Sequence, residues 1–223
     1  MWIQCIIIGI VALASMIPSL YYRYCYLHES QKPEKIQILL TEKKSGIILT
    51  LLNLAVGVMM IVLSIKNAAS WQVVLEQQIL LHVLIAAAGI DYSVKKIPNI
   101  LVAVMLLVWI VFLGIDFVQD PDFSSIGTRL LQALGGFLTG GIILLICMLL
   151  SRGGVGAGDV KLVAVLGLFY GMIGILNILF YSCLFAAIIS IILLVAKKLR
   201  LKDTVAMSPF ILMAVSAYNL MSI

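Results

Sequence analysis

The chain has 223 residues, of which 63% are hydrophobic and only 11% are charged, and its formal net charge is +5. A soluble domain is roughly 45–50% apolar and about 25% charged, so the composition excludes an ordinary soluble protein. The apolar residues come in runs close to the ~20 residues that a bilayer-spanning helix needs. Because a membrane β-barrel would show short alternating segments instead, we predict an all-α fold, a polytopic bundle of membrane helices.

Hydropathy divides the chain into about eight predicted transmembrane helices. They lie at about residues 2–20, 47–65, 72–90, 99–117, 129–150, 159–173, 175–196 and 206–222. The sixth is short and is separated from the seventh only by a weak turn around Gly171–Gly174. We therefore divide the chain into a first span with a short cytoplasmic connection, residues 1–46, and a membrane core, residues 47–223.

Basic residues give these spans an expected orientation. Thirteen of the 15 lysines and arginines fall on odd-numbered connections, and only Lys66 and Arg129 fall on even ones. Cytoplasmic loops of membrane proteins carry an excess of Lys and Arg, so we expect the odd connections in the cytoplasm and both termini outside. The positive charge thus reflects topology and contact with the anionic lipids of the cell membrane, and it requires no nucleic acid.

Small residues recur at helical spacing in the fifth and sixth predicted spans. Gly136 and Gly140 form one small-xxx-small pair, and Gly167 and Gly171 form another. Such pairs let helix backbones approach each other closely. We predict that they pack helices within the protein rather than between copies of it.

The cysteines and histidines do not suggest a metal site. No two of the four cysteines form a C-x-x-C pair, and the two histidines lie far apart without a partner at ligand spacing. We expect the cysteines to be small buried hydrophobic residues, and we expect neither a metal nor a cofactor.

Two of the ten acidic residues occupy unusual positions. Asp91 ends the third span in "AAAGIDYSVKKIPN", and Asp159 opens the sixth after "GGVGAG". Both are expected within the membrane, close to its cytoplasmic face. A carboxylate that is partly withdrawn from water there is energetically costly, which indicates a function. Pro98, followed by Asn99, fits the first turn of the fourth span. Glu76 is expected in a polar collar at the outer interface.

The sequence before Asp159 is typical of a shaped loop. Gly153, Gly154, Gly156 and Gly158 allow unusual backbone conformations and let another chain segment approach closely. Such a loop can lie below the lipid head groups if it lines a water-filled cavity. Asp159 is then expected in the first turn of a helix, where the helix dipole favours a negative charge.

Asp91 and Asp159 lie 68 residues apart in the sequence, and we predict that they meet. Two carboxylates in a cleft of low dielectric constant do not both ionise readily, so one keeps its proton and they titrate as a pair. That state suits peptide hydrolysis, because the ionised member takes a proton from water and the neutral member hydrogen-bonds the scissile carbonyl. The predicted chemistry is general acid–base catalysis.

The segment "GGVGAGDVKL", Gly153–Leu162, resembles the G-G-x-G-x-G-D-x-K-L signature of the prepilin peptidases, the type IV leader peptidase family. Asp91 with the downstream "IPN" is similar to the other aspartate motif of that family. "VAMSPF" at 205–210 is similar to its proline–phenylalanine motif, with Pro209 in place and Ala206 where a first proline is common. The similarity runs from about residue 40 to residue 223.

The resemblance implies a membrane aspartic endopeptidase of the GxGD type that works without a metal. Such enzymes remove the short basic leader from type IV prepilin-like proteins or pseudopilins at the cytoplasmic face, just before the substrate's hydrophobic stretch and typically after a glycine. The resemblance implies that Asp91 and Asp159 are the catalytic pair, that Gly156 and Gly158 shape the loop, and that Lys161 stands near the second aspartate.

The chain departs from this pattern in the first connection. Many bacterial members carry a cytoplasmic domain with two C-x-x-C pairs, linked to zinc and to N-methylation, whereas residues 21–46 of this chain hold Cys25 alone. We expect neither zinc binding nor methyltransferase activity.

Two alternatives remain open from the sequence. One is a cation- or proton-coupled transporter, which also uses acidic residues inside the membrane. The other is an intramembrane aspartic protease of the presenilin or signal-peptide-peptidase type. In that type the other aspartate follows a tyrosine and the last motif is Pro-Ala-Leu; here a tyrosine follows Asp91 and no Pro-Ala-Leu occurs.

Overall fold

The computed structural model describes residues 71–119, 121–151, 154–197 and 205–222, together with residues 55, 58 and 62. Within these ranges every regular element is a helix. Four helices are long and apolar enough to cross a membrane, and a shorter fifth is also apolar. The predicted all-α membrane fold is confirmed for this part of the chain. The first two predicted spans lie almost wholly outside the described residues, so the count of eight spans and the position of the termini stay predictions.

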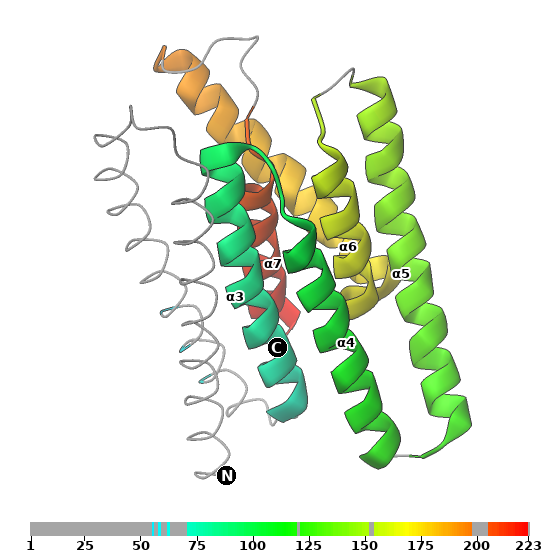
Figure 1. Ribbon diagram of the computed structural model, residues 1–223. Helices are drawn as coiled ribbons and strands as arrows, with labels where there is room; N and C mark the ends of the chain where they lie inside the picture. The colour runs from blue at the N-terminus through cyan, green and yellow to red at the C-terminus, as the bar shows by residue number, and fades with distance from the viewer. Residues whose placement is uncertain are drawn as a thin grey trace.

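The six predicted spans from the third to the eighth are present as five helices, because two of them form a single helix. The helices are α3 (Trp71–Val94), α4 (Asn99–Gln119), α5 (Phe123–Leu150), α6 (Ala157–Val195) and α7 (Ser208–Ser222). Helices α3, α4 and α5 run up and down the bundle, α7 lies behind α3, and α6 is bent (Figure 1). The sixth and seventh predicted spans are therefore the two arms of one helix.

Helix α3 is the interior element of the described bundle. Every residue from Leu80 to Asp91 is buried, and the helix packs against both α7 and α4. A helix that is apolar on all sides belongs in the interior, and the "AAAG" stretch is part of this buried run. Asp91 follows two residues after this stretch on the same buried helix, so its carboxylate is carried into the interior.

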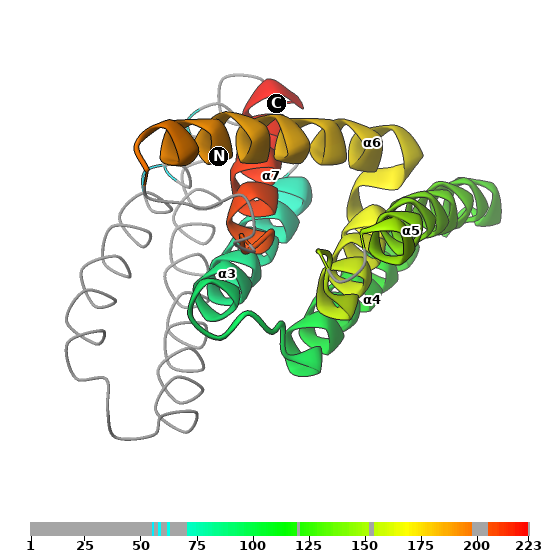
Figure 2. The same ribbon diagram turned by 90° about the horizontal axis from the view of Figure 1, so that it is seen from above.

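Helix α6 changes direction at Gly171. This residue has φ +64° and ψ −175° inside an otherwise helical segment, a backbone conformation that glycine adopts readily and other residues do not. The first arm, residues 157–170, rises only about 21 Å at 1.5 Å per residue, less than the ~30 Å hydrocarbon core of a bilayer. The second arm turns back and crosses α7 (Figure 2). The turn predicted around Gly171–Gly174 is present as this kink.

The first arm of α6 is held tightly against α5. These two helices share the most extensive packing in the described bundle. A methyl group at Gly136 of α5 would overlap the carbonyl oxygen of Gly167, and one at Gly167 would overlap the backbone of Gly136. The predicted packing of these glycines within the protein is therefore confirmed.

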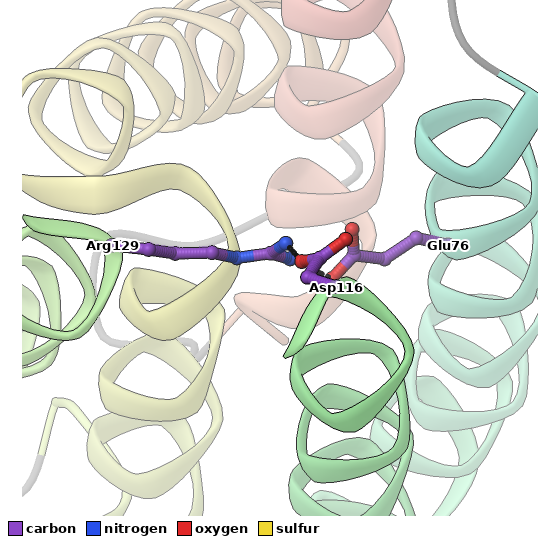
Figure 3. A network of polar contacts seen from close by, with 3 residues as sticks. All are labelled: Glu76, Asp116 and Arg129. Atoms are coloured by element: carbon purple, nitrogen blue, oxygen red, sulfur yellow. Dashed lines mark hydrogen bonds and ion pairs between the residues drawn. The ribbon is translucent and has the colours of Figure 1, made fainter. Parts of the chain in front are cut away.

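An ionic cluster fastens three helices at the end of the bundle away from Asp91. Arg129 of α5 is paired with Asp116 of α4, and its Nη2 lies 3.5 Å from Oε1 of Glu76 on α3 (Figure 3). We call these three residues the Arg129 cluster. The Glu76 side chain is only 14% exposed, so this guanidinium offsets part of the cost of withdrawing a carboxylate from water.

We predict that Gly136→Ala destabilises the protein, because the new methyl group meets rigid backbone rather than a movable side chain. Overpacking of this kind costs about 1–3 kcal/mol, seen as a lower unfolding midpoint in detergent. The matched control is Gly135→Ala, whose methyl group would meet nothing closer than Met172 Cβ at 3.9 Å. Equal midpoints for the two variants would contradict the packing described above.

The Arg129 cluster predicts a non-additive pair of substitutions. Arg129→Gln leaves the carboxylates of Glu76 and Asp116 without their cation, and we expect a loss of about 1–2 kcal/mol at this partly exposed site. Adding Asp116→Asn removes one of the two stranded charges and should restore part of that loss. Strictly additive unfolding free energies in this double-mutant cycle would show that the cluster does not couple the helices.

Candidate active site

Asp91 lies in the last turn of α3 and is 5% exposed. Its carboxylate atom Oδ2 accepts a hydrogen bond of 3.1 Å from the backbone N–H of Ser208. Ser208 is the first residue of α7, where backbone N–H groups have no partner inside the helix. A carboxylate oxygen is favourably placed at such a helix N-terminus. Helix α7 thus holds Asp91 from a position 117 residues away in the sequence.

Asp159 is the third residue of α6 and is 8% exposed. Its Oδ2 accepts a hydrogen bond of 3.2 Å from the backbone N–H of Gly156, while its own N–H donates to the carbonyl oxygen of Gly156 at 3.1 Å. This reciprocal pair closes the start of the helix. The predicted place of Asp159 in the first helical turn is confirmed.

Helix α3, whose last turn holds Asp91, ends at the same end of the bundle where α6, whose first turn holds Asp159, begins (Figure 1). Asp91 is close enough to act electrostatically on Asp159, and the Ser208 side chain also lies beside Asp159. Ser208 therefore touches one aspartate through its backbone and neighbours the other through its side chain. The catalytic role of the pair stays a prediction.

The site has hydrogen-bonding capacity that the protein does not use. Asp159 Oδ1 and Ser208 Oγ are both buried and have no hydrogen-bond partner among the described residues. A buried polar atom left unpaired costs about 1–3 kcal/mol, so native proteins supply such atoms with water or a bound polar group. Asp159 Oδ1 is therefore suited to accept a hydrogen bond from a water molecule, and the Ser208 hydroxyl is suited to bind a water molecule or donate to a peptide carbonyl.

The glycines before and after Ala157 make room for two close contacts at the start of α6, one with the segment that follows Asp91 and one with the Asp159 carboxylate. A methyl group at Gly158 would lie 3.0 Å from Ile97 Cβ, and one at Gly156 would lie 3.2 Å from Asp159 Oδ2. Both are tighter than ordinary van der Waals contact. Gly154 is in the turn before α6, and Gly153 lies outside the described residues.

The remaining predicted site residues lie near the starts of α4, α6 and α7. Lys161 Nζ donates a hydrogen bond of 3.1 Å to Asn99 Oδ1, and within the described ranges it forms no ion pair with either aspartate. Pro98 lies just before α4 rather than in its first turn, and its carbonyl oxygen accepts a backbone hydrogen bond from that turn. Pro209 is in the first turn of α7, where a residue without an N–H is tolerated.

Ser208 is the site residue that the sequence analysis did not single out. A serine followed by proline at the start of an apolar run is a typical helix N-terminus, so its place on α7 was readable. Its contact with Asp91 depends on how α7 docks against α3, and no local pattern indicates that.

No metal-binding cluster of three or more His, Cys, Asp or Glu residues occurs in the described ranges. Cys147 and Cys183 are free thiols on exposed helix faces, so the expectation that they are buried is wrong. The physical reason is that the outer faces of a membrane bundle are themselves apolar. Cys5 and Cys25 lie outside the described residues.

Comparison with known proteins adds two matches. The profile of the type IV leader peptidase family matches residues 78–191, a range that includes Asp91 and Asp159. The chain is 29% identical over 157 residues to the prepilin leader peptidase/N-methyltransferase of Neisseria gonorrhoeae, which covers 70% of this chain and 53% of that protein. The chain thus spans about half the length of this curated relative. No solved structure matches the chain.

The convergence of the two aspartates predicts a crosslink. In a version whose native cysteines are replaced by serine, Asp91→Cys with Asp159→Cys should be joined by a short thiol-specific crosslinker. Cleavage between α3 and α6 should then leave the two fragments linked on a denaturing gel. The control pair is Gly114→Cys with Asp159→Cys, because Gly114 is near the far end of α4 with open space around it. Equal crosslinking of the two pairs would contradict the convergence.

Proposed function

This chain belongs to the type IV leader peptidase family, and on that premise we propose that it is a membrane aspartic endopeptidase. Its substrates would be type IV prepilin-like proteins or pseudopilins, from which it removes the short basic leader. The observation that carries the proposal is the approach of Asp91 to Asp159 within the range that matches the family. N-methylation is not part of the proposal, because the connection at 21–46 holds a single cysteine.

The proposed mechanism uses one water molecule between the two carboxyl groups. The ionised aspartate removes a proton from this water, whose oxygen attacks the scissile carbonyl carbon, while the protonated aspartate hydrogen-bonds the carbonyl oxygen. Collapse of the tetrahedral intermediate breaks the C–N bond, and the departing amine takes up a proton from the pair. Asp159 Oδ1 supports this mechanism, because it is buried without a hydrogen-bond partner among the described residues and can accept a hydrogen bond from a water molecule.

We propose that the site faces the cytoplasm of the cell membrane, within an eight-span topology that leaves both termini outside. Lys95, Lys96 and Lys161 are exposed at the end of the bundle that carries the aspartates. The opposite end holds the Arg129 cluster, in which two carboxylates face one cation. This asymmetry supports the orientation, because Lys and Arg accumulate on the cytoplasmic side.

A transporter is the alternative reading of two acids at membrane depth. Transporter sites typically lie near the bilayer midplane, between repeated halves. Asp91 and Asp159 instead lie at the ends of their helices. Family membership and this position both favour the peptidase.

The proposal predicts that Asp91→Asn and Asp159→Asn each lower cleavage at least about 10²-fold, because each removes one member of the acid–base pair. The enzyme is co-expressed with a single-span reporter that carries a lysine-rich leader, a glycine and a ~20-residue apolar helix, and processing is followed as a gel mobility shift. Asp122→Asn is the matched control, because Asp122 is an exposed N-cap of α5 and asparagine caps helices equally well. Wild-type cleavage by either aspartate variant would refute the assignment.

A further inference from the structure

We infer that Ser208 is a positioning residue for both aspartates, with its N–H orienting Asp91 and its hydroxyl orienting Asp159. The inference rests on the proposed function, since it gives Ser208 a part in the action of that pair. It deepens the proposal by assigning to α7 the task of fixing the two carboxyl groups relative to each other.

The backbone half of this arrangement follows from how α7 begins. The carbonyl oxygen of Met207 accepts the first helical bonds, from Phe210 at 3.0 Å and Ile211 at 3.2 Å. The N–H of Ser208 therefore has no acceptor within its own helix. It donates to Asp91 Oδ2 at 3.1 Å instead, so the start of α7 fixes one oxygen of that carboxylate.

The hydroxyl half follows from two unused atoms. Ser208 is 0% exposed, and its hydroxyl lies beside Asp159. Ser208 Oγ and Asp159 Oδ1 are both buried and have no hydrogen-bond partner among the described residues, although one can donate and the other can accept. A serine side chain can turn its hydroxyl to suit its surroundings, and a bond from Oγ–H to Oδ1 would satisfy both atoms.

Such a bond would hold the Asp159 carboxyl group at both oxygens. Gly156 already donates to Oδ2 at 3.2 Å, and the Ser208 hydroxyl would donate to Oδ1. Each carboxylate oxygen can accept two hydrogen bonds, so room is left for a catalytic water. The carboxyl plane would then be fixed relative to Asp91, as general acid–base catalysis requires of its groups.

The position of α7 explains why one residue can serve both aspartates. Helix α7 packs against α3, which carries Asp91, and against α6, which carries Asp159. Any residue with a backbone N–H would satisfy Asp91. The hydroxyl is the part of Ser208 that acts on Asp159, so it can be removed without disturbing the first contact.

The test measures kcat and KM on the single-span reporter described above. Ser208→Ala and Ser208→Gly keep the N–H and remove the hydroxyl. We expect kcat to fall about tenfold to a hundredfold, the range for a hydrogen bond to a charged group, while KM changes less than about twofold because substrate binding is not altered. The matched control is Ser216→Ala, which removes a hydroxyl on the same helix that donates to Leu212 O at 2.8 Å.

A second pair of variants distinguishes the effect of the hydroxyl group from the effect of side-chain size. Ser208→Thr and Ser208→Val have nearly the same volume, so crowding in this buried position affects them equally. We expect the threonine variant to be faster than the valine variant by the factor that separates wild type from Ser208→Ala. A double-mutant cycle of unfolding stability, Ser208→Ala with Asp159→Ala, which removes the acceptor, should also show coupling between the residues.

The inference is overturned if Ser208→Ala keeps the wild-type kcat, or if threonine is no better than valine at equal amounts of folded protein. It is also overturned if the stability cycle is additive, a result that needs no substrate. The proposed function fails separately, when Asp91→Asn or Asp159→Asn cleaves the reporter as wild type does.

Discussion

Two carboxylates buried in a bundle of apolar helices must find their hydrogen-bond donors inside the protein, because lipid supplies none. Helical backbone offers free N–H groups only in its first turn, and the structure uses this source twice. Asp91 accepts from Ser208 at the start of α7, and Asp159 accepts from Gly156 at the start of α6. The need for donors therefore places both aspartates at the end of the bundle where α3 ends and two other helices begin.

The rest of the described bundle keeps those helix ends in place. Glycine contacts seat the first arm of α6 directly on α5, and the kink at Gly171 returns the second arm across α7 (Figure 2). At the far end, the Arg129 cluster ties α3, α4 and α5 together. Glycine can act in this way because it has no side chain, so two helix backbones can come into contact. Membrane helices depend on such close packing, since the hydrophobic effect does not drive helices together inside lipid.

The sequence predicted the helices and loops that depend on a local pattern of residues. It did not predict the contacts that depend on how the helices pack against one another. Apolar runs located α4 within two residues, at 99–117 against Asn99–Gln119. The fifth span was expected at 129 but α5 begins at Phe123, because Asp122 caps a polar first turn by accepting from Ser124 N–H at 3.1 Å. The loop glycines and Asp159 were predicted from the unusual local sequence. The contact of Ser208 with Asp91 joins residues that share no local signal.

The spacing of the two aspartates also depends on how their helices pack against neighbouring segments. Asp91 and Asp159 are carried by different helices, and two small residues lie where those helices meet their neighbours. Gly158 allows α6 to approach Ile97, in the segment after Asp91, and Ser208 fits at 0% exposure beside both carboxyl groups. A larger side chain at either position would have to push one helix away from the other, since protein interiors have little free volume. The spacing of the two acids is therefore set by close packing as much as by their own hydrogen bonds.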